Sequence, residues 1–143
     1  MRVDIIKTKL KIVEENVSLV KENLPEKIED FTNLGLIKDG IYKRIEASIQ
    51  EILSICSIIN TDLKLGVPPN RDEILKTLID NYIISEKMGR IVKELKGFRN
   101  FLVYRYGKIQ DEIAFEDIKK GLLDFKYFND EILLFLKRKN FEV

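Results

Sequence analysis

The chain contains no histidine, no tryptophan, one cysteine and three prolines among its 143 residues. The absence of histidine removes the usual general base near neutral pH and the commonest zinc ligand, and one cysteine cannot replace it. Serine–histidine and cysteine–histidine catalysis are therefore excluded. The single cysteine, Cys56, cannot form a disulfide within the chain. Its apolar neighbours in ILSICSIIN predict a buried side chain and a reducing cytoplasm.

Long apolar segments are also missing. The first residues, MRVDIIKTKLKIVEEN, are charged throughout and lack the apolar core of a signal peptide, and the longest apolar run is far too short to span a bilayer. We therefore expect a cytoplasmic protein that does not enter the membrane. The composition, 45% apolar and 34% charged, suits a globular protein. Its richness in lysine and glutamate is a thermophile pattern that an A/T-rich genome also produces.

Helical periodicity dominates what is present, and no segment alternates as a half-buried strand would. The spacing of apolar residues predicts five helices, and a short helical turn and loop between the first two. We therefore predict an all-α, up-and-down bundle of four long helices plus short ones, as a single domain over 1–143. The predicted helices span residues 3–24, 39–65, 72–82, 86–106 and 111–139.

The first of these helices carries a heptad pattern, with apolar residues spaced alternately by three and four. Three heptads are the lower limit for a coiled coil, so two interpretations stay open. The helix packs within the bundle, or it also pairs with another chain. The apolar residues are Val3, Ile6, Leu10, Val13, Val17, Val20 and Leu24.

Helix ends and core faces can also be predicted. Asp39 and Ser85 are expected to cap the second and fourth helices, Asn70 or Asp72 the third, and Gly107 is expected to end the fourth. The core face of the second helix is Ile41, Ile45, Ser48, Ile49, Ile52, Cys56 and Ile59. That of the last helix is Phe115, Ile118, Leu122, Phe125, Ile132, Leu133 and Leu136.

Charge is distributed unevenly along the chain. Residues 85–108 hold seven basic and two acidic side chains, a net +5, whereas the remainder holds 18 basic and 22 acidic side chains, a net −4. A basic segment of this kind attracts phosphates. A solvated helix face paired with acidic neighbours is the alternative, and charge alone favours that alternative.

The segment RNFLVYRY, residues 99–106, ends the basic helix. On an ideal helix Arg99 and Tyr106 lie about 20° apart, whereas Tyr104 lies about 140° from Arg99. Arginine can bind a phosphate bidentately, and tyrosine can hydrogen-bond or stack on a base. A tyrosine hydroxyl, with a pKa of about 10, is a poor base at neutral pH. From the residue types alone we interpret the segment as structural.

A wider comparison changes that interpretation. GFRNFLVYRY, residues 97–106, resembles the signature of HEPN-domain proteins of the HepT-like subgroup: arginine, a polar residue, three residues, histidine, any residue, tyrosine. Arg99, Asn100 and Tyr106 match this pattern, and Tyr104 stands where the family has its histidine. The order of helices and the loop LGVPPNRDEI are similar too, so the resemblance covers nearly the whole chain.

This resemblance implies a homodimer in which the motifs of two protomers face each other in a cleft. Active members are metal-independent endoribonucleases, so no cofactor or metal is expected, and tRNA or mRNA would be the substrate. Many are toxins whose antitoxin is a minimal nucleotidyltransferase (MntA-like) that can attach AMP to the terminal tyrosine, here Tyr106. The resemblance makes Arg99, Asn100 and Tyr104 the catalytic residues. The basic residues expected to bind RNA are Lys93, Lys96, Arg105 and Lys108.

The tyrosine at position 104 leads to three hypotheses. The protein is a HEPN toxin with weakened or altered ribonuclease activity, because loss of a general base commonly costs about 10² to 10⁴ in rate. Alternatively, it is a catalytically inactive HEPN module that binds a nucleotidyltransferase. As a third alternative, it is a purely structural helical dimer in which Arg99 and Tyr106 are both replaceable.

Overall fold

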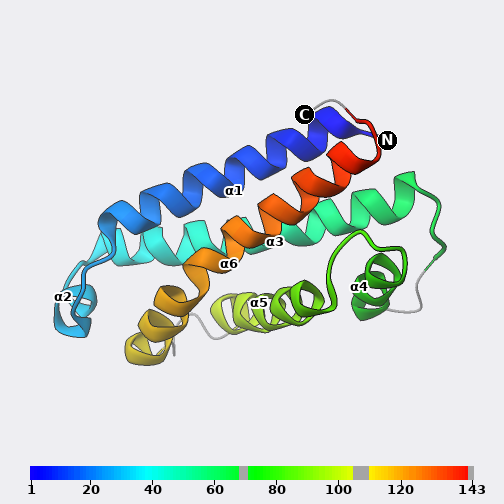
Figure 1. The fold of residues 1–143 in the computed structure, drawn as a ribbon. Coiled ribbons are helices and arrows are strands. Elements are labelled where there is room, and N and C mark those ends of the chain that lie inside the picture. Colours follow the sequence, from blue (N-terminus) through cyan, green and yellow to red (C-terminus); the bar gives the residue numbers. More distant parts are fainter. Residues whose placement is uncertain (68–70, 105–109, 142–143) are drawn as a thin grey trace.

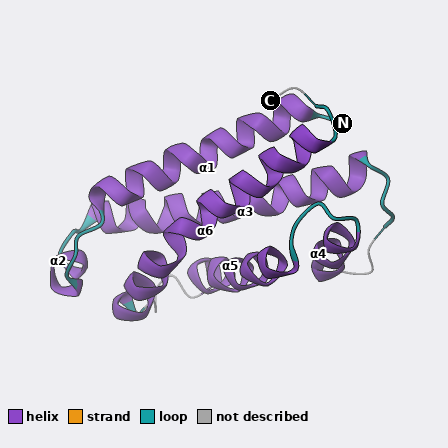
Figure 2. Ribbon diagram, in the orientation of Figure 1, coloured by secondary structure: helices purple, strands orange, loops and turns teal. Residues whose placement is uncertain are grey.

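The computed structural model describes residues 1–67, 71–104 and 110–141, and contains only helices and turns in these ranges. The described residues form four long helices and two short ones, as the sequence predicts, and Figure 1 and Figure 2 show their arrangement. The fold class is therefore confirmed. The helices are α1 (Val3–Asn23), α2 (Ile28–Thr32), α3 (Leu36–Asp62), α4 (Arg71–Asp80), α5 (Glu86–Tyr104) and α6 (Asp111–Arg138).

The four long helices run alternately up and down, and α3 lies in the middle of the bundle (Figure 1). Helix α3 packs against α1 on one side and against α5 and α4 on the other, while α6 crosses to contact α1, α2 and α5. The connections that include α2 and α4 lead the chain back along the bundle, so that consecutive long helices are antiparallel. The start of α6 and the end of α5 lie at the same end of the bundle (Figure 1).

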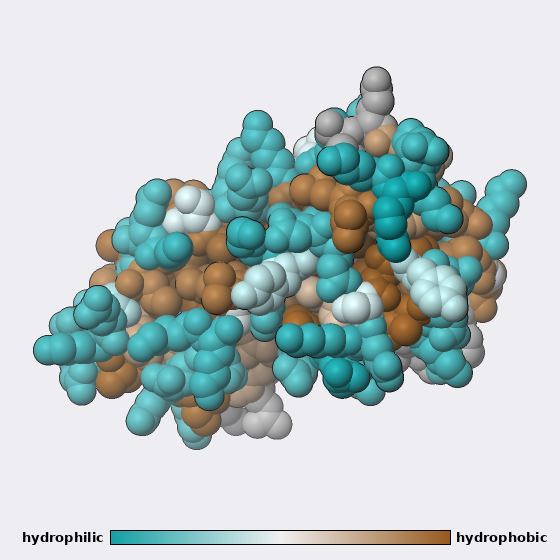
Figure 3. Space-filling view, in the orientation of Figure 1, coloured by the Kyte–Doolittle hydropathy of each residue, from teal (hydrophilic) through white to brown (hydrophobic). Residues whose placement is uncertain are grey.

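The heptad residues of α1 face the interior of this chain. Ile6, Leu10, Val13 and Val20 are buried, so the interpretation of α1 as a helix that packs within the bundle is confirmed. A different row of apolar residues, Ile5, Ile12 and Leu19, repeats every seven positions on the exposed side of α1. Figure 3 shows apolar residues lying between polar ones on one face of the molecule.

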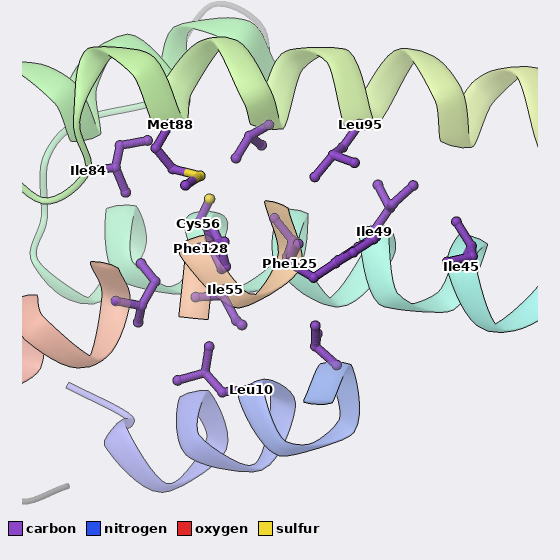
Figure 4. Close-up of a cluster of buried hydrophobic side chains, with 14 of the residues drawn as sticks. Leu10, Ile45, Ile49, Ile55, Cys56, Ile84, Met88, Leu95, Phe125 and Phe128 are labelled. Atoms are coloured by element: carbon purple, nitrogen blue, oxygen red, sulfur yellow. The ribbon is translucent and has the colours of Figure 1, made fainter. Parts of the chain in front are cut away.

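The core joins α1, α3, α5 and α6. In Figure 4 the sulfur atoms of Cys56 and Met88 point toward one another, and Leu95 lies over Ile49. Cys56 is buried, as predicted, and burial raises the pKa of its thiol to about 12. The thiol is therefore protonated at neutral pH, and a packing role follows. All seven predicted core residues of α3 are buried.

The predicted core face of α6 needs correction. Leu133 is 38% exposed, and Leu122 is only half-buried. Prediction missed three buried residues, Ala114, Phe128 and Phe135. The buried residues are spaced by three, four and seven positions and form one stripe along α6, and Leu122 and Leu133 lie about 80° to 100° around the helix axis from Ala114, at the edge of that stripe.

The ends of two helices test the predicted caps. Ser85 caps α5 as predicted, since the Met88 backbone N–H donates to Ser85 Oγ at 3.0 Å. Asp39 does not cap α3, because that helix begins earlier, at Leu36, after Gly35. Asp39 instead lies in the first turn, where a carboxylate is favourable beside free N–H groups. Asp72 lies inside α4, and Asn70 and Gly107 lie outside the described residues.

We predict opposite effects for alanine at Gly35 and at Gly40. Gly35 has φ 62° and ψ −126°, a conformation that L residues rarely adopt, and no atom lies near its Cβ position. Gly35→Ala should therefore lower the free energy of unfolding by about 1–3 kcal/mol. Gly40, inside α3 with open space around it, serves as the control, and Gly40→Ala should raise this free energy by about 0.5–1 kcal/mol. Urea unfolding measures both, and equal shifts would refute the assigned turn.

Candidate functional site at the end of helix α5

Arg99 is on the core-facing side of α5. It lies seven positions after Val92, so the two residues are about 20° apart around the helix axis. Leu102 lies three positions after Arg99. Val92 and Leu102 are both buried, whereas the Arg99 side chain is half-buried. The arginine therefore leaves the helix toward the interior at the open end of the bundle.

The guanidinium group of Arg99 is only partly satisfied. Its Nη1 donates to Asn100 Oδ1 at 3.3 Å. Its Nε is buried and has no hydrogen-bond partner among the described residues. An unsatisfied buried polar group costs about 1–3 kcal/mol, so this arrangement does not serve stability. A bound anion or water would satisfy such a group.

Asn100 extends the set of donors. Its Oδ1 is occupied by Arg99, and its NH₂ group makes no hydrogen bond with another described residue. The two side chains therefore present N–H donors, from a guanidinium group and from an amide group. Among the described residues, no carboxylate lies between them. A donor set of this kind fits an anion such as a phosphate group.

The predicted lysines lie near this donor pair. Lys93, Lys96 and Asn100 are spaced by three and four residues, so they share one side of α5. Lys93 is exposed and Lys96 is half-buried. The structure thus brings Arg99, Asn100 and the two lysines to one region. Tyr104 is the last residue of α5, but its side chain, like Arg105, Tyr106 and Lys108, lies outside the described part of the chain.

A second polar cluster ties α3 to the first turn of α6. Tyr42 Oη donates to Asp111 Oδ1 at 2.7 Å, and Lys38 Nζ donates to Asp111 Oδ2 at 2.9 Å. Burial by itself would raise the pKa of Asp111, but the hydrogen bonds from Tyr42 and Lys38 reverse this and lower it. The Tyr42 ring packs edge-on against Phe31, which in turn contacts Phe115. Prediction missed this cluster, for which the only signal was an acidic residue at a helix start.

Two further properties bear on the chemistry of the site. Among residues 1–67, 71–104 and 110–141, no three acidic, cysteine or histidine side chains lie close enough together to hold a metal ion. None of the helices in the same ranges is long and apolar enough to cross a membrane.

The fold is shared with solved HEPN proteins. A tri-AMPylated HEPN toxin of Shewanella oneidensis, solved in complex with an MNT antitoxin, matches 92% of this chain over 98% of its own, with 21% identity and a TM-score of 0.80. YutE, a cytosolic protein of unknown function from Bacillus subtilis, matches the whole chain over 96% of its own, with 19% identity and a TM-score of 0.83. At these identities the likeness establishes the fold.

The family follows from the sequence match. The family model for HepT-like ribonucleases matches residues 13–132, and the chain belongs to this family. The mRNA nuclease HepT of Shewanella oneidensis is 25% identical over 104 residues, which are 73% of this chain and 75% of that protein. The predicted family is thereby confirmed. The assignment of Tyr104 to the histidine position stays a prediction.

We predict that Tyr42→Phe weakens the tie to Asp111 in a pH-dependent way. The lowered pKa of Asp111 means that its stabilising effect is present above the unfolded value, about 3.9, and is lost as pH falls through the folded value. Loss of the hydroxyl should lower the free energy of unfolding by about 1.5–3 kcal/mol at pH 7, and by less at pH 3. Urea unfolding at both pH values measures this difference.

The control for this prediction is Tyr127→Phe on α6. Tyr127 is 48% exposed and makes no hydrogen bond with another described residue, so its effect should stay within about 0.5 kcal/mol at either pH. If Tyr42→Phe destabilises the protein equally at both pH values, the hydroxyl does not act through the ionised form of Asp111.

Proposed function

We propose that this protein is a HepT-like HEPN toxin that cleaves RNA without a metal ion, with weakened or altered activity. In this proposal residues 1–143 form one domain, and two copies form the active dimer. The observation that carries the proposal is the donor pair of Arg99 and Asn100, with a buried, unpartnered Nε, in a member of a ribonuclease family. Phosphate is the anion that such a family would place against these donors.

The proposed reaction is attack by an RNA 2′-hydroxyl on the adjacent phosphate. The 2′-oxygen bonds to phosphorus, the bond to the 5′-oxygen breaks, and the products are a 2′,3′-cyclic phosphate and a 5′-hydroxyl. One proton leaves the 2′-oxygen and one is delivered to the 5′-oxygen. Arg99 and Asn100 donate to the non-bridging oxygens, where charge grows in the transition state. Their partial burial strengthens this effect, since surrounding water is reduced.

The proton acceptor is the group that limits the cleavage rate at this site. With no histidine in the chain, Tyr104 is the motif residue available for the 2′-hydroxyl proton. A phenol with a pKa of about 10 is almost entirely protonated at pH 7, which makes it an inefficient base. Proximity to the arginine would lower that pKa and raise activity. The consequence is a slow reaction whose rate rises with pH through the neutral range.

We predict that cleavage depends on Arg99 and is limited by position 104. In buffer with EDTA, Arg99→Ala should reduce the first-order rate on tRNA or mRNA by about 10² to 10³, as loss of a transition-state donor does. Tyr104→His should raise the rate at pH 7 and make its pH dependence shallower, because a base with a pKa of about 6.5 replaces the phenol.

Arg90→Ala is the matched control for this experiment. Arg90 lies on the same helix, is exposed, and approaches Glu86 only at 4.0 Å, so its replacement should leave the rate unchanged. Equal cleavage by the wild type and by Arg99→Ala would mean that a contaminating nuclease produces the signal. No cleavage by either the wild type or Tyr104→His would favour the second function below.

The second candidate function is a catalytically inactive partner of a minimal nucleotidyltransferase antitoxin. The missing histidine favours it, as does the fact that the similar Shewanella toxin was solved AMPylated and in complex with an MNT antitoxin. In this function Tyr106 is the acceptor of AMP: its phenolic oxygen attacks the α-phosphate of ATP, pyrophosphate leaves, and the phenolic proton is lost.

Co-expression with a minimal nucleotidyltransferase tests this function. We predict that the two proteins copurify and that a mass spectrum shows AMP on Tyr106. Tyr106→Phe should abolish the adduct, whereas Tyr82→Phe, a change at a tyrosine that is 81% exposed, should leave it in place. A stable complex in which Tyr106 is unmodified would support the partner assignment and refute the modification. If no complex forms, both assignments are refuted.

A further inference from the structure

A pocket of about 240 Å³ opens between three helices on the lysine side of α5. It lies between α3, α4 and α5, next to the part of α5 that leads to Arg99. Because α4 packs on both α3 and α5, the pocket has walls on three sides. The residues that shape it are Gln50, Leu53, Ser54 and Ser57 of α3, Ile74 of α4 and Lys96 of α5.

The walls combine two kinds of surface. Leu53 and Ile74 are apolar, whereas Gln50, Ser54 and Ser57 carry polar groups that make no hydrogen bond with another described residue. These three side chains can both donate and accept. A nucleobase requires such a combination, because its faces are apolar and its edges carry donors and acceptors.

The other side of α5 differs in charge. The charged residues that line the pocket of about 220 Å³ between α5 and α6 are three acidic ones, Glu94, Asp117 and Asp124, and one basic one, Lys120. Burial raises the pKa of Asp124, and the charge of Glu94 raises it further, so this wall is already crowded with negative charge. No carboxylate is among the described residues that line the α3–α4–α5 pocket, and Lys96, which borders it, already has an interaction partner. A polyanion therefore approaches α5 more favourably from the α4 side.

We propose that the α3–α4–α5 pocket binds one base of the RNA strand whose phosphate is held by Arg99 and Asn100. Lys96 precedes Asn100 by four residues on the same side of α5, a rise of about 6 Å, which is the length of one or two nucleotides. The base lies between Leu53 and Ile74, and the serine hydroxyls and Gln50 contact its edge. This assignment rests on the proposed ribonuclease function.

The test uses short fluorescent oligoribonucleotides, each with a single abasic nucleotide at a different position, and measures binding by fluorescence anisotropy. For the wild type, removal of the base at one position should weaken binding about tenfold. Ser54→Leu fills the pocket and should weaken binding of the intact RNA by a similar factor. In that variant the abasic change at the same position should have no further effect.

Three variants make the result decisive. Ser57→Leu, at an exposed position on the pocket rim, repeats the test if Ser54→Leu fails to fold. Ser18→Leu, at an exposed position of α1, is the matched control and should bind all RNAs like the wild type. Arg99→Ala should weaken every oligonucleotide alike and keep the abasic sensitivity.

The outcomes distinguish a failure of the pocket assignment from a failure of the proposed ribonuclease function. If the wild type binds no RNA, both the ribonuclease proposal and the pocket assignment are overturned. If RNA binding depends on Arg99 while Ser54→Leu and Ser57→Leu retain the abasic sensitivity, only the pocket assignment fails. A wild type that binds RNA equally well with an abasic nucleotide at every position also overturns it.

Discussion

The burial of α3 on two sides is the constraint on which the rest of this structure depends. Ten of its residues are buried, and each buried aliphatic side chain contributes about 1.5–3 kcal/mol. Because α1 packs on one side and α5 on the other, α5 is held in one rotation about its axis. That rotation directs Val92 and Leu102 to the core, and Arg99 lies between them in the same row.

The position of Arg99 matters for both the stability of the fold and the proposed function. A charged side chain that starts from a core-facing position needs its polar atoms satisfied, yet its Nε has no partner among the described residues. The cost is consistent with a site prepared to bind an anion, because donors already oriented and partly dehydrated need little reorganisation when phosphate arrives. The Tyr42–Lys38–Asp111 cluster holds the opposite side of the same bundle end.

Local features of the sequence were the most predictable. Ser85 caps α5 because its hydroxyl lies three residues before the N–H that it accepts from, a relation within one turn. The buried residues of α3 follow a regular stripe because neighbouring helices cover it along its whole length. Two predictions failed: Asp39 lost the cap position to the turn at Gly35, and Leu133 is exposed because it lies at the edge of the buried stripe of α6.

The sequence by itself determined the helices, the family and the chemical limit set by the absence of histidine. These depend on residue types and on spacings of three, four and seven, which a chain contains before it folds. Only the tertiary structure decided that Tyr42 and Lys38 meet Asp111, and that Ser54 and Lys96 border one pocket. The reason is that such contacts join residues far apart in the chain, and helix packing sets their distance.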